Sequence, residues 1–458
     1  MNRREWLAFL ALLPLMGSAR ALAPKVEAAR GVRFVALGDA EYAGTRGGFA
    51  KRVMRQPALL ALCSEVDGVR RALEVAAESG LKVGIRSGGH CFEGHGLIDG
   101  GMLIDLSAMN AVSVANERAV IGPGAKLGGV YQQLGAAGRL LPAGSCAGVG
   151  VAGLALGGGY GFFARQYGLT SDHLVGLDLI TSDGRHLRAE GDDELLVACR
   201  GGGNGHFGVV TKFEFQTQRL PSRFASFRWR FRQLDVPRAR ALAERFCGLA
   251  ADLPRTCYGS FVLNGRTLTV LVTDFADQMS PALAKRLAEF GRDATETPAP
   301  REDGLLPGIQ RFSGGTTPMY FKNFSAGYYA DWADLARGFD PLAAIVLERK
   351  PTSILQINTL GSAIADRSVK SVYAHRKALF LGEFQVYWNT PAQAAAALAL
   401  AASARTEIER HWTAHYANYP NDEFRGAAEA YYGNQLGRLQ ALKKKLDPDR
   451  RFQEASAI

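Results

Sequence analysis

The sequence predicts an α+β fold with two domains, and three observations support this expectation. The chain has 458 residues, which is long for a single hydrophobic core. Its first half mixes helical and strand periodicities and is rich in glycine, of which the chain holds 53. Its second half begins with aromatic residues that alternate with arginines over 227–232, a pattern typical of a strand with one face in water. A hydrophobic share of 47% excludes a disordered or fibrous chain.

The N-terminus predicts an export signal over residues 1–23. Arg3 and Arg4 precede an apolar stretch from Trp6 to Met16, and Ala19-Arg20-Ala21 supplies a small-residue cleavage pattern. The apolar stretch is too short to span a membrane. The arginine pair resembles a twin-arginine signal, although ordinary signals also contain such pairs. We therefore expect an exported protein, periplasmic or secreted, with no stable membrane span.

Periodicity and turn residues place the elements of the first half in order. Apolar residues at helical spacing from Val66 end at Gly80, and a strand-like segment follows at once. On the same criteria we expect helices over 66–77 and 127–137, and strands over 81–85, 98–106, 112–121 and 174–181. This half is a mixture of α and β elements.

The segment after Leu220-Pro221 predicts an antiparallel sheet with helices on one face. Beyond the alternating segment at 227–232, we expect strands over 258–263, 267–275, 353–360 and 380–388, and helices near 238–250, 281–290 and 392–411. A last, long helix is expected over 422–446, ended by Asp447-Pro448.

Charge and cysteine usage exclude several functions. The formal net charge is +10, but the basic residues are scattered and not interleaved with aromatic ones, so we expect no nucleic-acid binding. The six cysteines are widely spaced and no C-x-x-C occurs, which argues against a disulfide scaffold and a zinc site. We expect no metal, and whether Cys247 and Cys257 form a disulfide stays open.

Glycine concentrates in four segments: 86–90, 122–124, 144–161 and 201–208. Glycine lets backbone N–H groups converge on phosphate oxygens or lie against a flat ring, so the four loops indicate one large anionic ligand. Two G-x-G-x-x-G matches, at 148–153 and 203–208, raise the alternative of a nicotinamide dehydrogenase. That fingerprint requires a strand before and a helix after the glycines. The residues around 148–153 predict neither, so we interpret both matches as coincidental.

A set of motifs in this chain resembles the berberine-bridge-enzyme-like family of FAD-linked oxidases. The motifs occur in the family's order: Arg86-Ser87-Gly88-Gly89-His90, Cys146-Ala147-Gly148-Val149-Gly150, Leu156-Gly157-Gly158-Gly159-Tyr160-Gly161, Tyr167-Gly168-Leu169-Thr170-Ser171-Asp172, Thr181-Ser182-Asp183-Gly184, Phe207-Gly208-Val209-Val210 and Tyr432-Gly433-Asn434. The resemblance covers about Leu60 to Phe452. It implies an FAD cofactor and a two-part FAD-binding PCMH-type domain, residues 30–215 and 415–458, with a substrate domain over 220–410 inserted between the parts.

The resemblance also implies two covalent bonds to the flavin. His90 matches the position of an 8α-histidyl bond, and Cys146 matches that of a 6-S-cysteinyl bond. Without the flanking motifs, His90 would be interpreted as a turn histidine and Cys146 as a small buried hydrophobe. Cys91 is a second thiol nearby, but its position does not match the family's cysteine.

Further residues are expected around the cofactor. The candidates for pyrophosphate and ring contacts are Arg86, Ser87, Gly88, Gly89, Gly150, Gly153, Gly158, Gly208, Val210 and Asn434. Leu154 stands where plant members have a histidine, and His206 where the family usually has an asparagine. Val149 matches a position at which valine accompanies oxidases, which favours molecular oxygen as the acceptor; plain core packing is the alternative.

Flavin oxidation of an alcohol requires a base for the hydroxyl proton. Glu383 matches the position at which the family places a Glu or Gln base, and an outward, solvated glutamate is the alternative. Tyr419 matches a tyrosine that serves the family as base or positioning group. Because the ordinary pKa of tyrosine is near 10, a base role would require a nearby cation or carboxylate partner, and Lys322 and Arg376 are the candidate cations.

We therefore expect an FAD-linked oxidase with doubly attached flavin. Its substrate would be an alcohol or hemiacetal in a carbohydrate or secondary metabolite, and oxygen would be reduced to hydrogen peroxide. The alternatives are a flavin dehydrogenase that uses a quinone or another acceptor, and a secreted binding protein without catalysis.

Overall fold

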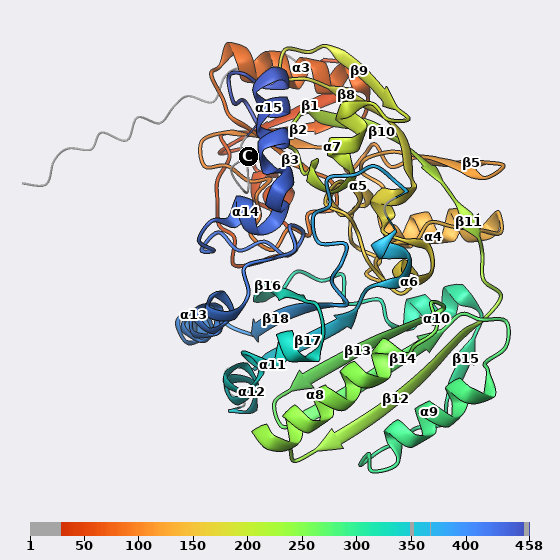
Figure 1. Cartoon of the computed structure of the whole chain (residues 1–458). Coiled ribbons are helices and arrows are strands. Elements are labelled where there is room, and N and C mark those ends of the chain that lie inside the picture. Colours follow the sequence, from red (N-terminus) through yellow and green to blue (C-terminus); the bar gives the residue numbers. More distant parts are fainter. Residues whose placement is uncertain (1–28, 349–351, 367, 453–457) are drawn as a thin grey trace, which may run out of the picture.

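The computed structural model describes residues 29–348, 352–366, 368–452 and 458. The fold is α+β and has two parts, one above the other in Figure 1. The upper part contains the N-terminal half and the C-terminal end of the chain, and the lower part contains a large antiparallel sheet. The expected export signal at 1–23 lies outside the described residues.

Two sheets form the upper part. The first has the order β1-β2-β4-β3 and pairs β4 in parallel with both of its neighbours. Its strands are β1 (Val32–Ala36), β2 (Leu59–Cys63), β3 (Val83–Arg86) and β4 (Met102–Asp105). The second is antiparallel, with the order β5-β6-β10-β8-β9 and strands β5 (Val112–Ala115), β6 (Arg118–Ile121), β8 (Leu174–Ile180), β9 (His186–Glu190) and β10 (Val209–Gln216).

Short helices and turns of the upper part connect these sheets and carry the glycine-rich loops. The helices are α2 (Tyr42–Arg46), α3 (Val66–Glu78), α4 (Leu127–Ala136), α5 (Val151–Leu156), α6 (Ala164–Tyr167), the 3-10 turn η1 (Thr170–His173) and α7 (Glu194–Gly202). Two short strands, β7 (Arg139–Leu140) and β11 (Gln218–Arg219), pair where the chain leaves for the lower part.

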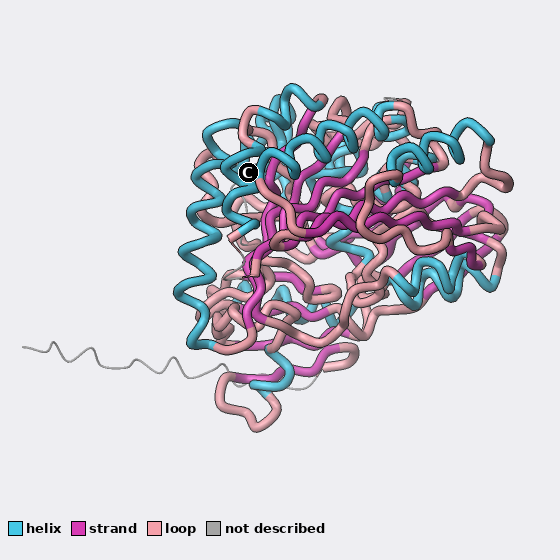
Figure 2. The backbone as a smooth tube through the Cα atoms, turned by 90° about the horizontal axis from the view of Figure 1, so that it is seen from below, coloured by secondary structure: helices cyan, strands magenta, loops and turns pink. Residues whose placement is uncertain are grey.

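The lower part is a seven-stranded antiparallel sheet with the order β15-β12-β14-β13-β17-β18-β16. Its strands are β12 (Phe224–Arg232), β13 (Cys257–Asn264), β14 (Thr267–Asp274), β15 (Arg301–Asp303), β16 (Tyr320–Tyr329), β17 (Ser353–Thr359) and β18 (Phe380–Trp388). The associated helices are α8 (Val236–Ala251), α9 (Pro281–Gly291), α10 (Leu305–Arg311), α11 (Trp332–Ala336), α12 (Phe339–Leu347) and α13 (Ala394–His411), and helices border the sheet in Figure 2.

Alternation along β18 gives the sheet two different faces. Phe384 and Val386 belong to the buried core on the side of α12 and α13, whereas Glu383, Gln385 and Tyr387 line a cavity on the other side. Helices α12 and α13 therefore cover one face, and the face directed at the upper part carries polar side chains.

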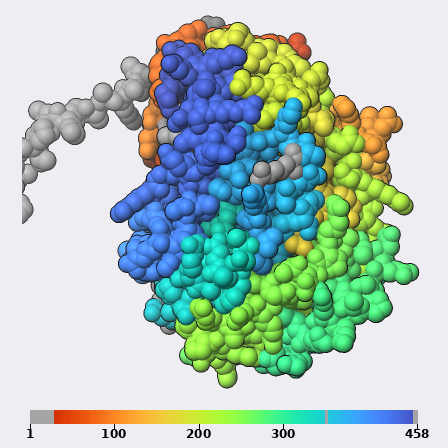
Figure 3. Space-filling model, in the orientation of Figure 1, coloured from red at the N-terminus to blue at the C-terminus, as the bar shows by residue number. Residues whose placement is uncertain are grey.

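The C-terminal segment returns to the upper part, where it lies along the N-terminal elements in Figure 3. It contains α14 (Ala427–Tyr432), the 3-10 turn η4 (Gly433–Gln435) and α15 (Leu436–Leu446), and Phe452 bridges to Val83 of β3. We propose domain bounds of 30–215, 220–410 and 415–458 on this arrangement.

Three sequence expectations need correction. The single helix over 422–446 is wrong, because Gly433 takes a φ of 50° and separates α14 from α15. The strand over 112–121 is a hairpin, with a turn at Asn116, whose φ is 55°. A six-residue helix, α5, does follow Gly150, although no helix was expected there.

The Rossmann alternative still fails on element order. The second match, at 203–208, follows helix α7 and precedes strand β10, which is the reverse of the strand-then-helix order that the fingerprint requires. All six cysteines are free, so Cys247 and Cys257 form no disulfide here. Among the described residues, no helix is long and apolar enough to cross a membrane and no cluster of potential metal ligands occurs.

Candidate active site

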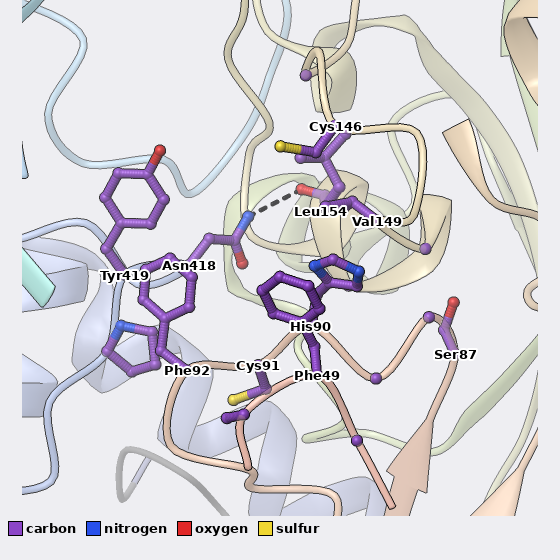
Figure 4. A pocket seen from close by; sticks show the side chains of 18 of the residues that line it. Phe49, Ser87, His90, Cys91, Phe92, Cys146, Val149, Leu154, Asn418 and Tyr419 are labelled. Atoms are coloured by element: carbon purple, nitrogen blue, oxygen red, sulfur yellow. Dashed lines mark hydrogen bonds between the residues drawn. The ribbon is translucent and has the colours of Figure 1, made fainter. Parts of the chain in front are cut away.

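A cavity of about 640 Å³ lies between the glycine-rich loops and the polar face of the large sheet. Its walls come from segments far apart in the sequence, including residues within 86–97, 144–162 and 204–210 of the upper part, and residues of strands β16, β17 and β18 of the lower part. Figure 4 shows Cys146, Val149 and Leu154 on one side of this space and His90 and Phe49 facing them. The cavity thus unites the glycine loops with the candidate base.

His90 sits at the cavity wall with its ring held against Phe49. The two ring centroids are 4.2 Å apart with an interplanar angle of 16°, so the imidazole is stacked (Figure 4). Burial, and secondarily the charge of Lys126, lowers the pKa of His90 to about 4. The imidazole is therefore neutral at pH 7 and keeps a nitrogen lone pair available for bond formation.

Cys146 lies on a separate loop that also lines the cavity. The backbone N–H of the next residue, Ala147, donates a 2.9 Å hydrogen bond to the Ser313 hydroxyl, which fixes this loop to the lower part. Burial, and less strongly the Glu383 carboxylate, raises the pKa of the Cys146 thiol, against a hydrogen bond with the backbone of Gly314. Cys146 is thus a neutral thiol in the folded chain, within the electrostatic reach of Glu383.

Glycines make the loops close enough to each other to form one wall. A β-carbon on Gly88 would lie 2.2 Å from the backbone nitrogen of Gly150, so no side chain fits between these loops. Gly89 has a φ of 71°, which favours glycine. Gly153, in contrast, lines the cavity and has open space where a β-carbon would be. The glycine loops therefore pack closely against each other, and at Gly153 no side chain covers the backbone on the cavity side.

Arg86 and Ser87 line the cavity, but their polar groups hold the loop itself. The Arg86 guanidinium contacts Asp105 and donates to the carbonyl oxygens of Thr45, Arg46 and Gly47. The Ser87 hydroxyl donates to the Pro123 carbonyl at 2.6 Å. These two side chains therefore position the backbone around His90.

Glu383 is buried, with 5% of its surface exposed, and lines the cavity rather than the outer surface. Burial raises the pKa of its carboxyl to about 7, against hydrogen bonds from Gln385 and Tyr419 that lower it. A carboxyl group with this pKa exchanges a proton readily at neutral pH, which is the property that a general base needs.

Tyr419 lies next to this carboxyl but lacks the cation that a base role would require. Its hydroxyl is 2.6 Å from that of Tyr160. Burial and the carboxylate of Glu383 raise the pKa of Tyr419 well above its ordinary value. Of the expected cations, Lys322 pairs with Glu93 at 2.6 Å, and Arg376 pairs with Asp172. The geometry favours Glu383 as the base and Tyr419 as a positioning group.

A chain of hydrogen bonds, not anticipated from the sequence, lines the sheet side of the cavity. Gln385 donates to Gln356 at 3.2 Å, Gln356 to Asn358 at 2.9 Å, and Asn358 to the Tyr160 hydroxyl at 3.0 Å. Because Tyr160 contacts Tyr419, the chain runs around Glu383 and back to it. The period-two pattern of β17 could have indicated its polar face, but only pairing with β18 brings that face to the site.

Asn323 adds an unpaired polar atom to the same wall. Its amide nitrogen donates to the Tyr387 hydroxyl at 2.9 Å, and that hydroxyl donates to Gln385 at 3.0 Å. Its amide oxygen is buried without a hydrogen-bond partner, although the residue lines the cavity. A buried acceptor without a partner costs about 1–3 kcal/mol, so this oxygen is available to a donor on a ligand.

Two of the expected cofactor residues do not line the cavity. Gly158 is buried away from the cavity, and a β-carbon there would lie 2.8 Å from the Tyr373 ring, so this glycine permits close packing. Asn434 is exposed in η4 and is not part of the cavity wall. Gly208 and Val210 do line the cavity. We do not retain Gly158 and Asn434 as flavin contacts.

The two departures from the family pattern have clear surroundings. Leu154 lines the cavity with an apolar side chain, while its carbonyl oxygen accepts a 3.0 Å hydrogen bond from Asn418 (Figure 4). His206 is fully buried, and its Nε2 is 3.1 Å from the Tyr432 hydroxyl. His206 therefore joins the glycine loop to α14 and does not enter the cavity wall.

Comparison with known protein families assigns two segments of the chain. Residues 57–190 match the model of the FAD binding domain family, and residues 415–458 match the berberine and berberine-like family. A chitooligosaccharide oxidase of Gibberella zeae is 30% identical over 443 residues, covering 89% of this chain and 88% of that protein. The chain belongs to the berberine-bridge-enzyme-like family of FAD-linked oxidases. As a member of this family it is an FAD-dependent oxidoreductase.

Solved structures agree with this assignment. The berberine-bridge-enzyme-like protein 1 of Physcomitrella patens has a TM-score of 0.86 at 25% identity, and covers 93% of this chain and 97% of its own. A chitooligosaccharide oxidase has a TM-score of 0.84 at 26% identity, with the same two coverages. The alignment includes both the glycine-rich part and the large sheet, so the family fold extends over nearly the whole chain.

The residues present fit an FAD molecule. The cavity is lined by glycines of several loops and by the sheet, and at Gly153 there is open space where a β-carbon would be. Loop glycines crowd one another but leave their backbone facing the cavity, which suits a pyrophosphate or a flat ring. His90 and Cys146 stand on two different loops of the same wall.

Proposed function

We propose that this protein is an oxidase that removes hydrogen from an alcohol or hemiacetal carbon of a carbohydrate or a related metabolite, and that it passes the electrons to molecular oxygen. The observation that carries the proposal is the position of Glu383: a buried carboxyl with a pKa of about 7, in the cavity wall opposite the glycine-rich loops. An oxidation of this type needs a proton acceptor there.

The protein side of the mechanism rests on a few residues. Bound FAD supplies the hydride acceptor. Glu383 takes the proton from the substrate hydroxyl, and Tyr419 and Gln385 hydrogen-bond to its carboxylate and hold it in place. Glu383 itself is buried, and the low dielectric constant around it strengthens each of these polar contacts.

Polar groups on the sheet favour a substrate with several hydroxyl groups. Gln356, Gln385, Tyr387 and Asn323 present amide and hydroxyl groups to the cavity, and the Asn323 amide oxygen is free to accept a hydrogen bond. A site built to hydrogen-bond a hydroxyl discriminates strongly against analogues without one. The names of the two chitooligosaccharide oxidases also support a carbohydrate.

Val149 supports oxygen as the acceptor. Its short side chain lines the cavity three residues after Cys146, on the same side of the cavity as that cysteine (Figure 4). We propose hydrogen peroxide as the second product on this basis.

We further propose that the flavin is bound covalently through His90 and Cys146. The neutral imidazole of His90 can add to the flavin's 8α position, and the Cys146 sulfur, once deprotonated, can add to ring carbon six. Residues 86–89 and Gly150, Gly153, Gly208 and Val210 would surround the rest of the cofactor. We also propose that residues 1–23 are an export signal and that the protein is periplasmic or secreted.

A screen of sugars, oligosaccharides and simple alcohols for peroxide release tests the reaction. We expect peroxide from at least one polyhydroxylated substrate and little from simple alcohols. Electron transfer to a dye or quinone with no peroxide in air would instead identify a dehydrogenase. If no substrate bleaches the yellow flavin under anaerobic conditions, the proposed oxidation is refuted.

Peptide mapping tests the two covalent bonds separately. We expect flavin mass on the tryptic peptides that contain His90 and Cys146, and yellow colour that survives acid precipitation. The variant Cys146→Ser should keep the histidine-linked flavin and show a shifted absorption spectrum. An unchanged spectrum would refute the second bond, and colourless precipitate would refute both.

A further inference from the structure

A second group of reactive side chains adjoins the site: Cys91, His95 and Asp422. Cys91 directly follows His90 and lines the same cavity, as does His95. The Cys91 sulfur is 3.5 Å from His95 Nδ1, and His95 Nε2 is 2.5 Å from an oxygen of Asp422. A thiol, an imidazole and a carboxylate thus stand in hydrogen-bonded sequence, which is the arrangement of an activated sulfur nucleophile.

The carboxylate end of the group is fixed by a further partner. Arg55 donates to the second oxygen of Asp422 at 3.1 Å. The His95 side chain is 15% exposed, compared with 37% for Asp422, so the imidazole lies between solvent and the cavity. Asp422 therefore orients the ring so that Nδ1 faces the Cys91 sulfur.

Electrostatics favour the charged pair. Burial opposes ionisation of Cys91, but the charge and hydrogen bonds of His95 outweigh it and lower the pKa of the thiol. Burial also opposes a charge on His95, yet Cys91 and Asp422 together raise its pKa to about 10. The carboxylate of Glu93, on the same loop, is paired with Arg52 and Lys322, and a hydrogen bond from the Glu93 backbone also lowers the pKa of Cys91. Both shifts favour the thiolate–imidazolium form of the pair.

The thiols of the other five cysteines have raised pKa values, unlike that of Cys91. Burial raises the pKa of Cys146, and raises the pKa of four further thiols to about 12; these are Cys63, Cys199, Cys247 and Cys257. All six cysteines lie in the described part of the chain, and Cys91 alone among them has a lowered pKa. A sequence comparison that follows the family's cysteine selects Cys146 and passes over this thiolate.

We propose that Cys91 is a modification site at which hydrogen peroxide converts the thiolate to a sulfenic acid. The thiolate sulfur attacks one peroxide oxygen, an S–O bond forms and the O–O bond breaks. The electron pair leaves with hydroxide, which takes the His95 proton and becomes water. Sulfur is oxidised and peroxide is reduced, and the neutral His95 that results loses its charge pairing with the former thiolate.

Oxidation of Cys91 would affect the proposed active site, because Cys91 lines the same cavity. The source of peroxide rests on the proposed oxidase function, which would release that product in the cavity that Cys91 lines. Oxidation would place a bulkier, uncharged group beside His90, the proposed flavin attachment. Accumulated peroxide would therefore modify a residue in the wall of the cavity in which it is produced.

The experiment exposes the holoenzyme to added hydrogen peroxide in the presence of dimedone, which traps sulfenic acids, and locates the label by peptide mass spectrometry. A thiolate reacts faster than a thiol of ordinary pKa, although its lower basicity offsets part of the gain. We expect Cys91 to be labelled at least about tenfold faster than any other cysteine. Equal labelling, or flavin mass found on Cys91 itself, would overturn the proposal.

Variants and pH test the role of His95. His95→Gln should slow labelling of Cys91 about tenfold, whereas His186→Gln, which changes an exposed histidine on β9, should not. In the unchanged protein, alkylation of Cys91 by iodoacetamide should level off at a lower pH than alkylation of an ordinary thiol, whose rate rises about tenfold per pH unit below its pKa. A rate that rises in this ordinary way would overturn the proposal even if the variant fails to fold.

A turnover arm separates this proposal from the oxidase function. If added peroxide labels Cys91, the modification site is supported whatever the enzyme's acceptor. Label on Cys91 that appears during turnover in air, and that is absent when catalase is added, supports both the modification site and the oxidase function. Absence of label with added peroxide overturns the site alone, since peroxide release by the enzyme is measured independently.

Discussion

Replacement of Glu383 by glutamine tests the central step of the proposed mechanism. Glutamine keeps the shape and hydrogen-bonding capacity of the side chain but cannot accept the substrate proton. Positioned general bases contribute about 10²–10⁴-fold to rate. We expect Glu383→Gln to lower kcat/KM by about this factor, with little change in the fold or in flavin content.

The pH dependence of the rate follows from the same carboxyl. Its pKa is raised by burial from an ordinary 4.5 to about 7, and only the ionised form can act as a base. We therefore expect kcat/KM of the unchanged enzyme to rise with pH through a limb near pH 7 and then level off. The residual activity of Glu383→Gln should lack this limb.

Stability gives a second measurement that needs no substrate. In the folded state the carboxyl keeps its proton until about pH 7, whereas the unfolded chain loses it near 4.5. Between these values the folded state binds the extra proton, so the free energy of unfolding falls as pH rises. One pH unit corresponds to about 1.4 kcal/mol, so the full loss above pH 7 is about 3 kcal/mol.

Glu383→Gln removes this ionisation and should be less sensitive to pH. Urea unfolding at pH 5 and pH 8 measures the difference, and we expect the variant to gain stability relative to the unchanged protein on going from pH 5 to pH 8. A variant that keeps the limb near pH 7, or whose relative stability is the same at both values, would refute the assignment of Glu383 as a buried base.

Three further predictions concern the surroundings of the site. Tyr419→Phe should lower kcat several-fold and keep the pH limb but move it to higher pH, because the hydrogen bond that lowers the pKa of Glu383 is lost while the raised pKa of Tyr419 excludes it as the titrating base; loss of that limb would contradict the assignment. Gly153→Leu should fill the open space in the cavity and reduce FAD content in the purified protein, whereas Gly129→Leu, on an exposed helix position with equally open surroundings, should load FAD normally. Glu93→Leu leaves Lys322 buried without its main counter-charge and should lower the free energy of unfolding by about 3–5 kcal/mol, as measured in urea; a change under 1 kcal/mol would show that the pair is dispensable.

Local patterns predicted the elements with strong periodicity. The helix expected over 66–77 is α3, and the strand expected over 380–388 is β18 with the same bounds. Periodicity failed at residues 422–446, since apolar spacing continues past Gly433 although its positive φ ends the helix. A change in backbone conformation at one residue leaves almost no trace in an apolar pattern.

The sequence by itself determined the family, the FAD cofactor and the candidate residues His90, Cys146 and Glu383, because these depend on short motifs whose residues are neighbours along the chain. Tertiary structure decided which candidates meet. It placed Glu383 in the cavity, excluded Asn434 from its wall, and paired Lys322 with Glu93 instead of Tyr419.

The pairing of Cys91 with His95 and Asp422 was likewise decided by the fold. His95 is four residues from Cys91, but Asp422 arrives only when the C-terminal segment returns to the first half of the chain. Burial and charge at such a junction depend on contacts across more than three hundred residues. Motifs therefore name the cofactor, while the acidity of each group around it follows from packing that no local pattern contains.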